Sequence, residues 1–235
     1  MDWDYPVYKP KKAKPETGSV GRSVARALTR ERALEVIAGD DPRPLLVLRE
    51  CKVCNGTDEA LLKGGADNEK TFLLARWFHC VKLPVDVMEE DHPFHNLFTE
   101  DTPEHLFVCS LDGTNHDALQ SDTSRVELWD SMTGLLAEEY EKKPQKPLKT
   151  ITRLLDKMDT VDQRLAGLIA KREAVLEKEG PKSRKLKKLQ KDISKAQEEV
   201  KGYRAEISKV SSLKLKADRK KAKEAKKAKG APAGA

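Results

Sequence analysis

The chain has 235 residues, of which 36% are charged and only 5% are aromatic. This length suits one ordinary domain with an appendage or two small domains. The aromatic and charged fractions are unusual for a chain that is globular throughout and indicate that a large part of it is solvated helix or disorder. The formal net charge of +6 conceals two regions of opposite sign, since residues 181–235 contain 19 Lys/Arg and 6 Asp/Glu while residues 1–180 have an acidic excess.

The start of the chain, MDWDYPVYKPKKAKP, does not have the basic and then apolar order of a secretory signal. No stretch approaches the roughly 18 apolar residues that a membrane span requires. We therefore expect an intracellular, cytoplasmic protein without a membrane segment. In such a reducing compartment a close cysteine pair indicates metal binding, catalysis or coincidence more than a structural disulfide.

The first part of the chain predicts disorder, then a helix, then a strand. Residues 1–20 mix Pro, Lys and Gly, which is typical of a disordered segment. Apolar residues at helical spacing predict a helix from Arg22 that ends at Gly39. The apolar run in RPLLVLRE, residues 43–50, predicts a buried strand directly before the first two cysteines.

Two further strands follow, with helices around them. The segment 67–78 predicts a helix, and HCVKLPVDV, residues 79–87, predicts a strand because apolar residues recur there at a period of two. A short helix should precede PEHLFVCSLDGT, residues 103–114, which predicts a third strand closed by a turn at Asp112-Gly113. A last helix is expected over residues 121–143. Its predicted apolar stripe consists of Val126, Trp129, Leu135 and Leu136. Together these elements indicate an α/β domain.

Two prolines in KKPQKP, residues 142–147, separate this domain from a region with a heptad pattern. The expected seam consists of Leu154, Met158, Val161, Leu165 and Leu168, and then of Leu186, Leu189, Ile193, Ala196, Val200, Tyr203, Ile207 and Val210. Gly180-Pro181 lies between the two runs, where Gly favours a helix end and Pro prevents continuation. We predict an antiparallel helical hairpin over residues 148–217 with its turn at 180–181; the alternative is one long helix that dimerises in parallel. Residues 218–235 should be a basic disordered tail.

The cysteine pair CKVC, Cys51 and Cys54, lies between the first predicted strand and a helix-forming segment. A thiol at the start of a helix is stabilised as thiolate by the helix dipole, so this position suits a redox pair. About 50 residues later, Thr102-Pro103 precedes the third predicted strand.

This arrangement resembles the thioredoxin-like superfamily, whose members carry CxxC at the start of a helix and a cis-proline, facing the thiols, just before the third core strand. VKLPVDV, residues 81–87, also looks like the central strand of that family. The resemblance implies a thioredoxin-like domain over residues 21–143 and thiol–disulfide exchange with protein thiols and disulfides. It further implies that Cys51 is the attacking thiol, Cys54 the resolving thiol and Pro103 the cis-proline.

A zinc site is the rival interpretation of the cysteine pair. CKVCNG resembles the CxxCxG zinc knuckles of J-domain co-chaperones, and a tetrahedral site needs two further ligands. His92 and His95, in HPFH, are the candidates by spacing, so the alternative zinc ligands are Cys51, Cys54, His92 and His95. Cys80 and Cys109 fall in predicted strands, where free cysteines behave as small buried apolar residues.

Three functions therefore remain open. The first is a thiol–disulfide oxidoreductase localised by its basic coiled coil. The second is a non-catalytic thioredoxin-fold scaffold whose working part is the hairpin. The third is a zinc-stabilised nucleic-acid-binding protein. For the basic residues 181–229 the expected partners are a polyanion (RNA, DNA or the ribosome) or another coiled coil, while the plainer interpretation is a solvated helix face.

Overall fold

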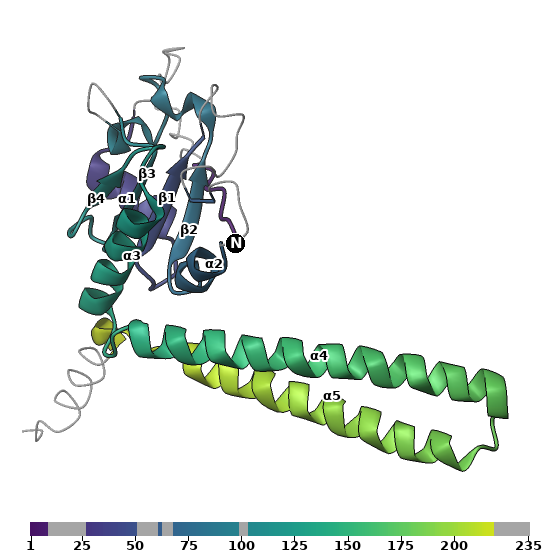
Figure 1. Cartoon of the computed structure of the whole chain (residues 1–235). Coiled ribbons are helices and arrows are strands. Elements are labelled where there is room, and N and C mark those ends of the chain that lie inside the picture. The colour runs from purple at the N-terminus through teal and green to yellow at the C-terminus, as the bar shows by residue number, and fades with distance from the viewer. Residues whose placement is uncertain (9–26, 51–60, 63–67, 99–102, 219–235) are drawn as a thin grey trace, which may run out of the picture. The chain divides into compact units, whose positions relative to one another are not determined.

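The computed structural model describes residues 1–8, 27–50, 61–62, 68–98 and 103–218. The chain divides into two compact units, an α/β unit of residues 1–143 together with the segment from residue 214 onward, and a helical unit of residues 144–213 (Figure 1). The mixed α/β class and the helical hairpin are as the sequence predicts. In the described part of the chain, no helix combines the length and the apolar character needed to cross a membrane.

The α/β unit is built on one mixed sheet of four strands in the order β2-β1-β3-β4. Its strands are β1 (Leu45–Arg49), β2 (His79–Leu83), β3 (Leu106–Cys109) and β4 (Asp117–Leu119). β1 is parallel to β2 and antiparallel to β3, and β4 is antiparallel to β3. Its helices are α1 (Arg30–Ala38), α2 (Glu69–Ala75) and α3 (Arg125–Glu139), with two 3₁₀ turns, η1 (Val85–Met88) and η2 (His95–Leu97), between β2 and β3.

Both faces of the sheet are covered, as the burial of consecutive residues in β1 shows. Leu45 and Val47 lie in one apolar cluster with α1 and η2, while Leu46 and Leu48, which alternate with them, are equally buried on the opposite face. On this opposite side α3 contacts β3 and α2, and the Trp129 indole donates to the Thr71 hydroxyl at 2.9 Å. The unit therefore has three layers, with the sheet between helices.

Several sequence predictions need correction at the ends of elements. α1 begins only at Arg30, because the Thr29 side chain accepts a hydrogen bond from the Arg32 amide and caps the helix there. β2 ends at Leu83, since Pro84 starts a 3₁₀ turn, so the predicted extension of the strand to residue 87 is wrong. β2 is also an outer strand of the four, and the central position expected for it belongs to β1.

The apolar stripe predicted for the last helix of the α/β unit is also partly wrong. Val126 is 63% exposed, and the buried residues of α3 are Leu128, Met132, Leu135 and Leu136. Ser124 and Glu127 form a capping box, which fixes where the helix starts. The first residues are not all disordered, since the Asp4 amide donates to the Cys80 carbonyl at 2.9 Å. Asp4 thus pairs with the open edge of β2.

The turn between β3 and β4 lies where the sequence predicts it. Gly113 has φ +80°, and a Cβ atom there would lie 2.6 Å from Leu34 of α1. Only glycine combines this left-handed backbone with such a close approach. The Asp112-Gly113 turn therefore requires its glycine on both counts.

The helical unit consists of α4 (Gln145–Glu179) and α5 (Arg184–Ser211). α4 begins three residues earlier than predicted, because Pro147 lies in the first turn, where a missing N–H has no partner to lose. Gly180 ends α4 with φ +72°, and the Ser183 side chain caps α5. One ion pair joins Glu179 to Lys185 beside the turn, and another joins Arg164 of α4 to Glu199 of α5 further from it, so the two helices run antiparallel within one chain.

The predicted heptad seam is buried in one part of the hairpin. Val161, Ala196 and Val200 form its buried cluster, and Met158, Leu165 and Tyr203 pack around them. α5 ends at Ser211, so the hairpin is shorter than the predicted range up to residue 217. The tail from residue 219 onward lies outside the described residues.

Candidate functional site

The predicted redox residues flank a well-defined junction at the end of β1. The Arg49 amide donates to the His105 carbonyl at 2.9 Å, and the Glu50 amide donates to the Leu83 carbonyl at 3.0 Å. Two consecutive residues thus hydrogen-bond to opposite neighbours, Arg49 on the β3 side and Glu50 to β2. Cys51 and Cys54 come directly after this junction, but both lie outside the described residues.

The Arg49 side chain connects the junction with Pro103. Its guanidinium donates to the Glu104 carbonyl at 3.1 Å and to the Pro103 carbonyl at 3.3 Å. It also lies over the Phe98 ring, with its central carbon 5.9 Å from the ring centroid. Pro103 therefore lies beside the residue that is two positions before Cys51, although 54 residues separate Pro103 from Arg49. Thr102 is outside the described residues, so the cis geometry expected for Pro103 stays a prediction.

A second charged residue at the junction, Glu50, is already engaged. Its carboxylate lies 3.1 Å from the Lys82 ammonium, whose side chain is only 11% exposed. A nearby anion raises the pKa of a thiol, and this lysine offsets the charge of Glu50. The pair thus reduces the penalty that Glu50 would impose on a thiolate at the neighbouring position.

Glu104, the residue after Pro103, is a buried carboxylate that sequence reasoning did not single out. Its Oε1 lies 3.3 Å from His116 Nε2, and its side chain is 5% exposed. Burial opposes its ionisation, but the hydrogen bond with His116 and a backbone hydrogen bond keep the pKa of Glu104 below its usual value. The junction thus includes an anion that remains charged although it is buried.

His105 lies between Glu104 and β3, and here the environment favours the neutral form of the side chain. Burial, aided by the nearby positive charge of Arg49, lowers the pKa of His105. The neutral imidazole is therefore favoured here at neutral pH. The sequence has no signal for Arg49 or Glu104, because their proximity depends on the antiparallel register of β1 and β3.

Of the two histidines of the zinc hypothesis, His92 lies between η1 and η2, and His95 is the first residue of η2. His92 Nδ1 accepts a hydrogen bond from the Phe94 amide at 3.2 Å, and its Nε2 lies 4.0 Å from Asp86. Burial lowers the pKa of His92. Among the residues that the structure describes, no three His, Cys, Asp or Glu side chains are grouped as a metal site. The two cysteine ligands of the hypothesis lie outside them.

The other two cysteines are buried in strands, as predicted. Cys80 lies in β2 and Cys109 in β3, and burial raises the pKa of each thiol to about 12. Thiolate is the reactive form, so these two thiols are inert near neutral pH. Any thiol chemistry of this chain therefore falls to Cys51 and Cys54.

Comparison with known proteins gives no family for this chain: no protein-family model, no curated protein and no solved structure matches it. Its function must therefore be inferred from the fold class and from the chemistry of the junction after β1.

Proposed function

We propose that the α/β unit is a thioredoxin-like thiol–disulfide oxidoreductase with Cys51 and Cys54 as its redox pair. One observation carries the proposal, namely the hydrogen bond from the Arg49 guanidinium to the Pro103 carbonyl. The thioredoxin-like resemblance requires the segment after the first core strand to lie beside a proline that precedes the third. Here β1 leads into the CxxC segment, and Pro103 lies three residues before β3 begins at Leu106.

In the proposed reaction, the Cys51 thiolate attacks one sulfur of a protein disulfide. A mixed disulfide forms, and the other substrate sulfur leaves as a thiolate that takes up a proton. The Cys54 thiolate then attacks the Cys51 sulfur, which forms the Cys51–Cys54 disulfide and releases the second substrate thiol. The substrate gains two electrons and two protons, and a dithiol reductant returns the pair to its reduced form.

The charged groups around the junction support this chemistry. Lys82 offsets the charge of Glu50 next to Cys51, and Arg49 adds a positive charge one residue further away. Both favour a thiolate over a thiol. Pro103 would contribute to the groove that receives the backbone of the partner.

The test is reduction of insulin disulfides by dithiothreitol, followed by turbidity, with the full chain as catalyst. Cys51→Ser should abolish catalysis, and Cys54→Ser should accumulate a mixed disulfide with the substrate. The control is Cys80→Ala/Cys109→Ala, which removes the two inert thiols and should keep full activity. Unchanged activity in Cys51→Ser, or one tightly bound zinc in a native mass measurement, would refute the proposal.

The hairpin favours a second candidate function, an interaction module that retains the fold as a scaffold. Residues 171–191 of the hairpin contain nine Lys/Arg and three Glu, which is far more basic than the rest of the chain before the tail. In this case a Cys51→Ser/Cys54→Ser variant would keep its partner, whereas charge reversal in α4 and α5 would lose it.

A further inference from the structure

The end of the hairpin around its turn differs from the rest of it in burial. We call residues 168–191 the hairpin tip. Between Asp162 and Asp192 no described residue is buried, although Leu168, Val175, Leu176, Leu186 and Leu189 all lie there. Leu176 is 46% exposed. The two helices therefore leave apolar surface uncovered at the tip.

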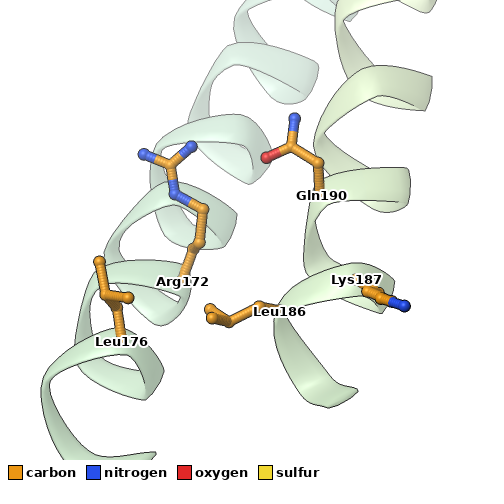
Figure 2. Close-up of a pocket in the computed structure, with 5 residues that line it drawn as sticks. All are labelled: Arg172, Leu176, Leu186, Lys187 and Gln190. Atoms are coloured by element: carbon orange, nitrogen blue, oxygen red, sulfur yellow. The ribbon is translucent and has the colours of Figure 1, made fainter. Parts of the chain in front are cut away.

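The uncovered surface includes a groove between the two helices. It has a volume of about 490 Å³ and is lined by Arg172, Leu176, Leu186, Lys187 and Gln190. Figure 2 shows Leu186 directed from α5 toward α4, while Lys187 points away from α4. The floor of the groove is thus apolar, and cationic side chains lie on both of its sides.

The charge of the tip is strongly positive. Residues 171–191 contain nine Lys/Arg and three Glu, and one of these acidic residues, Glu179, is already paired with Lys185. For comparison, residues 145–160 and 195–211 together contain eight Lys/Arg and five Asp/Glu. Positive charge is therefore concentrated where the apolar seam is open.

We propose that the hairpin tip binds an acidic amphipathic helix of a partner protein. A helix that presents leucines along one stripe would bury them against Leu176 and Leu186, as in helix-in-groove recognition. Its carboxylates would face Arg172 and Lys187. This inference rests on the hairpin as an interaction element, the second candidate function, and not on the chemistry of Cys51.

Charge argues against one other occupant of this surface, and the exposed leucines argue against another. A second copy of this chain would bring the same basic tip and would be repelled. Nucleic acid would use the cations but would leave the leucines uncovered, because its affinity comes mainly from phosphates. Of these three occupants, only the acidic amphipathic helix matches both the cations and the leucines of the surface.

The experiment measures binding of the full chain to a fluorescent peptide of about 18 residues, longer than the roughly 12–15 residues below which an isolated helix is marginal. The peptide carries Leu at positions i, i+3, i+7 and i+10 and mainly Glu elsewhere. Leu176→Gln/Leu186→Gln should weaken binding about tenfold or more, because the variant removes the two apolar side chains against which the leucines of the peptide would be buried. Arg172→Glu/Lys187→Glu should weaken it at least as much.

The matched control is Lys195→Glu/Lys209→Glu, which changes the net charge by the same amount at exposed positions of α5 outside the tip. This variant should bind the peptide within about twofold of wild type, since screening limits distant charges. Circular dichroism confirms that each variant is helical. Cys51→Ser should bind as wild type does, which separates this inference from the redox proposal.

Three results would overturn the proposal. The leucine variant binds the peptide as tightly as wild type does, or a peptide with Gln in place of its leucines binds equally well. The third result is that uridine homopolymer RNA or phosphatidylglycerol vesicles bind the tip equally well in wild type and in Leu176→Gln/Leu186→Gln. Each of them would make the tip a general polyanion surface.

Discussion

The α/β unit and the hairpin differ most in how far their apolar residues are buried. In the α/β unit, Leu45, Leu46 and Val47 are consecutive and are all 0% exposed, because helices cover both faces of β1. In the hairpin, no described residue between Asp162 and Asp192 is buried. In the α/β unit, packing on both faces of the sheet buries the apolar side chains. In a two-helix hairpin only the facing sides are buried, and the other side of each helix is left to solvent or to a partner.

The contrast extends to charged groups. The α/β unit buries Glu104, whose carboxylate lies 3.3 Å from the His116 ring, and Lys82, which is paired with Glu50. In the hairpin the ion pairs are at the surface, as for Lys201 and Glu198. Buried charges position the chain around the junction after β1, while surface charges determine what the hairpin attracts.

The largest expected effect is on the core of the α/β unit. Phe107→Ala should lower the free energy of unfolding by about 3–5 kcal/mol, because Phe107 is 0% exposed and its removal leaves a cavity. The control is Phe72→Ala in α2, where the side chain is 42% exposed and the loss should be a small fraction of that. Urea unfolding followed by circular dichroism measures both, and equal losses would contradict the assigned core.

A smaller effect is expected at the buried carboxylate next to Pro103. Glu104→Gln should lower the stability of the α/β unit at neutral pH by about 1–3 kcal/mol, because the variant removes one partner of a charge-assisted hydrogen bond. The control is Glu138→Gln, an exposed position of α3 that should be nearly neutral.

The same residue predicts how stability depends on pH. The folded pKa of Glu104 lies below its ordinary value of 4.5, so its contribution is present above that pH and is lost as the pH falls through the folded pKa. The lowered pKa of His105 adds a loss that begins below about pH 6.5. The unfolding temperature, measured from pH 7 to pH 3, should therefore fall less steeply below pH 4.5 in Glu104→Gln than in wild type. An unchanged acid limb would show that Glu104 does not titrate in this range.

Next in size is a buried hydrogen bond at the end of α3. The Tyr140 hydroxyl donates to the Trp77 carbonyl at 2.7 Å, and burial raises the pKa of Tyr140. Tyr140→Phe should cost about 1 kcal/mol of unfolding free energy, while Tyr5→Phe, where the ring is 60% exposed, should cost almost nothing. A spectrophotometric titration should show Tyr140 ionising only after the exposed tyrosines.

These residues also show what sequence could and could not predict. An apolar run, a strand segment closed by Asp-Gly and the heptad pattern correctly located β1, β3, the Asp112-Gly113 turn and the two helices of the hairpin, since such signals are local in the sequence. The sequence did not predict β4, which has three residues and one buried side chain. It placed Leu135 and Leu136 on the buried side of α3 correctly but wrongly added Val126, because packing against β3 and α2 decides which side is covered.

The candidate site was predictable only in part, for a physical reason. Cys51, Cys54 and Pro103 were found because CxxC and Thr-Pro are motifs with local meaning. Arg49 joins β1 to Pro103 through the pairing of β1 with β3, and that register is set by tertiary packing. The contact at the centre of the functional proposal is thus one that no local pattern could reveal.

The smallest expected effect is on the ion pair between Arg164 and Glu199 in the hairpin. Both side chains are accessible to solvent, so water and salt screen most of their attraction. Arg164→Met should lower the thermal stability of the full chain slightly at low salt, and the difference should vanish near 1 M salt, where the screening length is about 3 Å. Arg204→Met is the control, since Arg204 is exposed and forms no ion pair within the described residues. If the difference between the two variants persisted at high salt, packing of the Arg164 stem against α5 would be the cause, and the hairpin would resemble the α/β unit more than the exposure of its helices suggests.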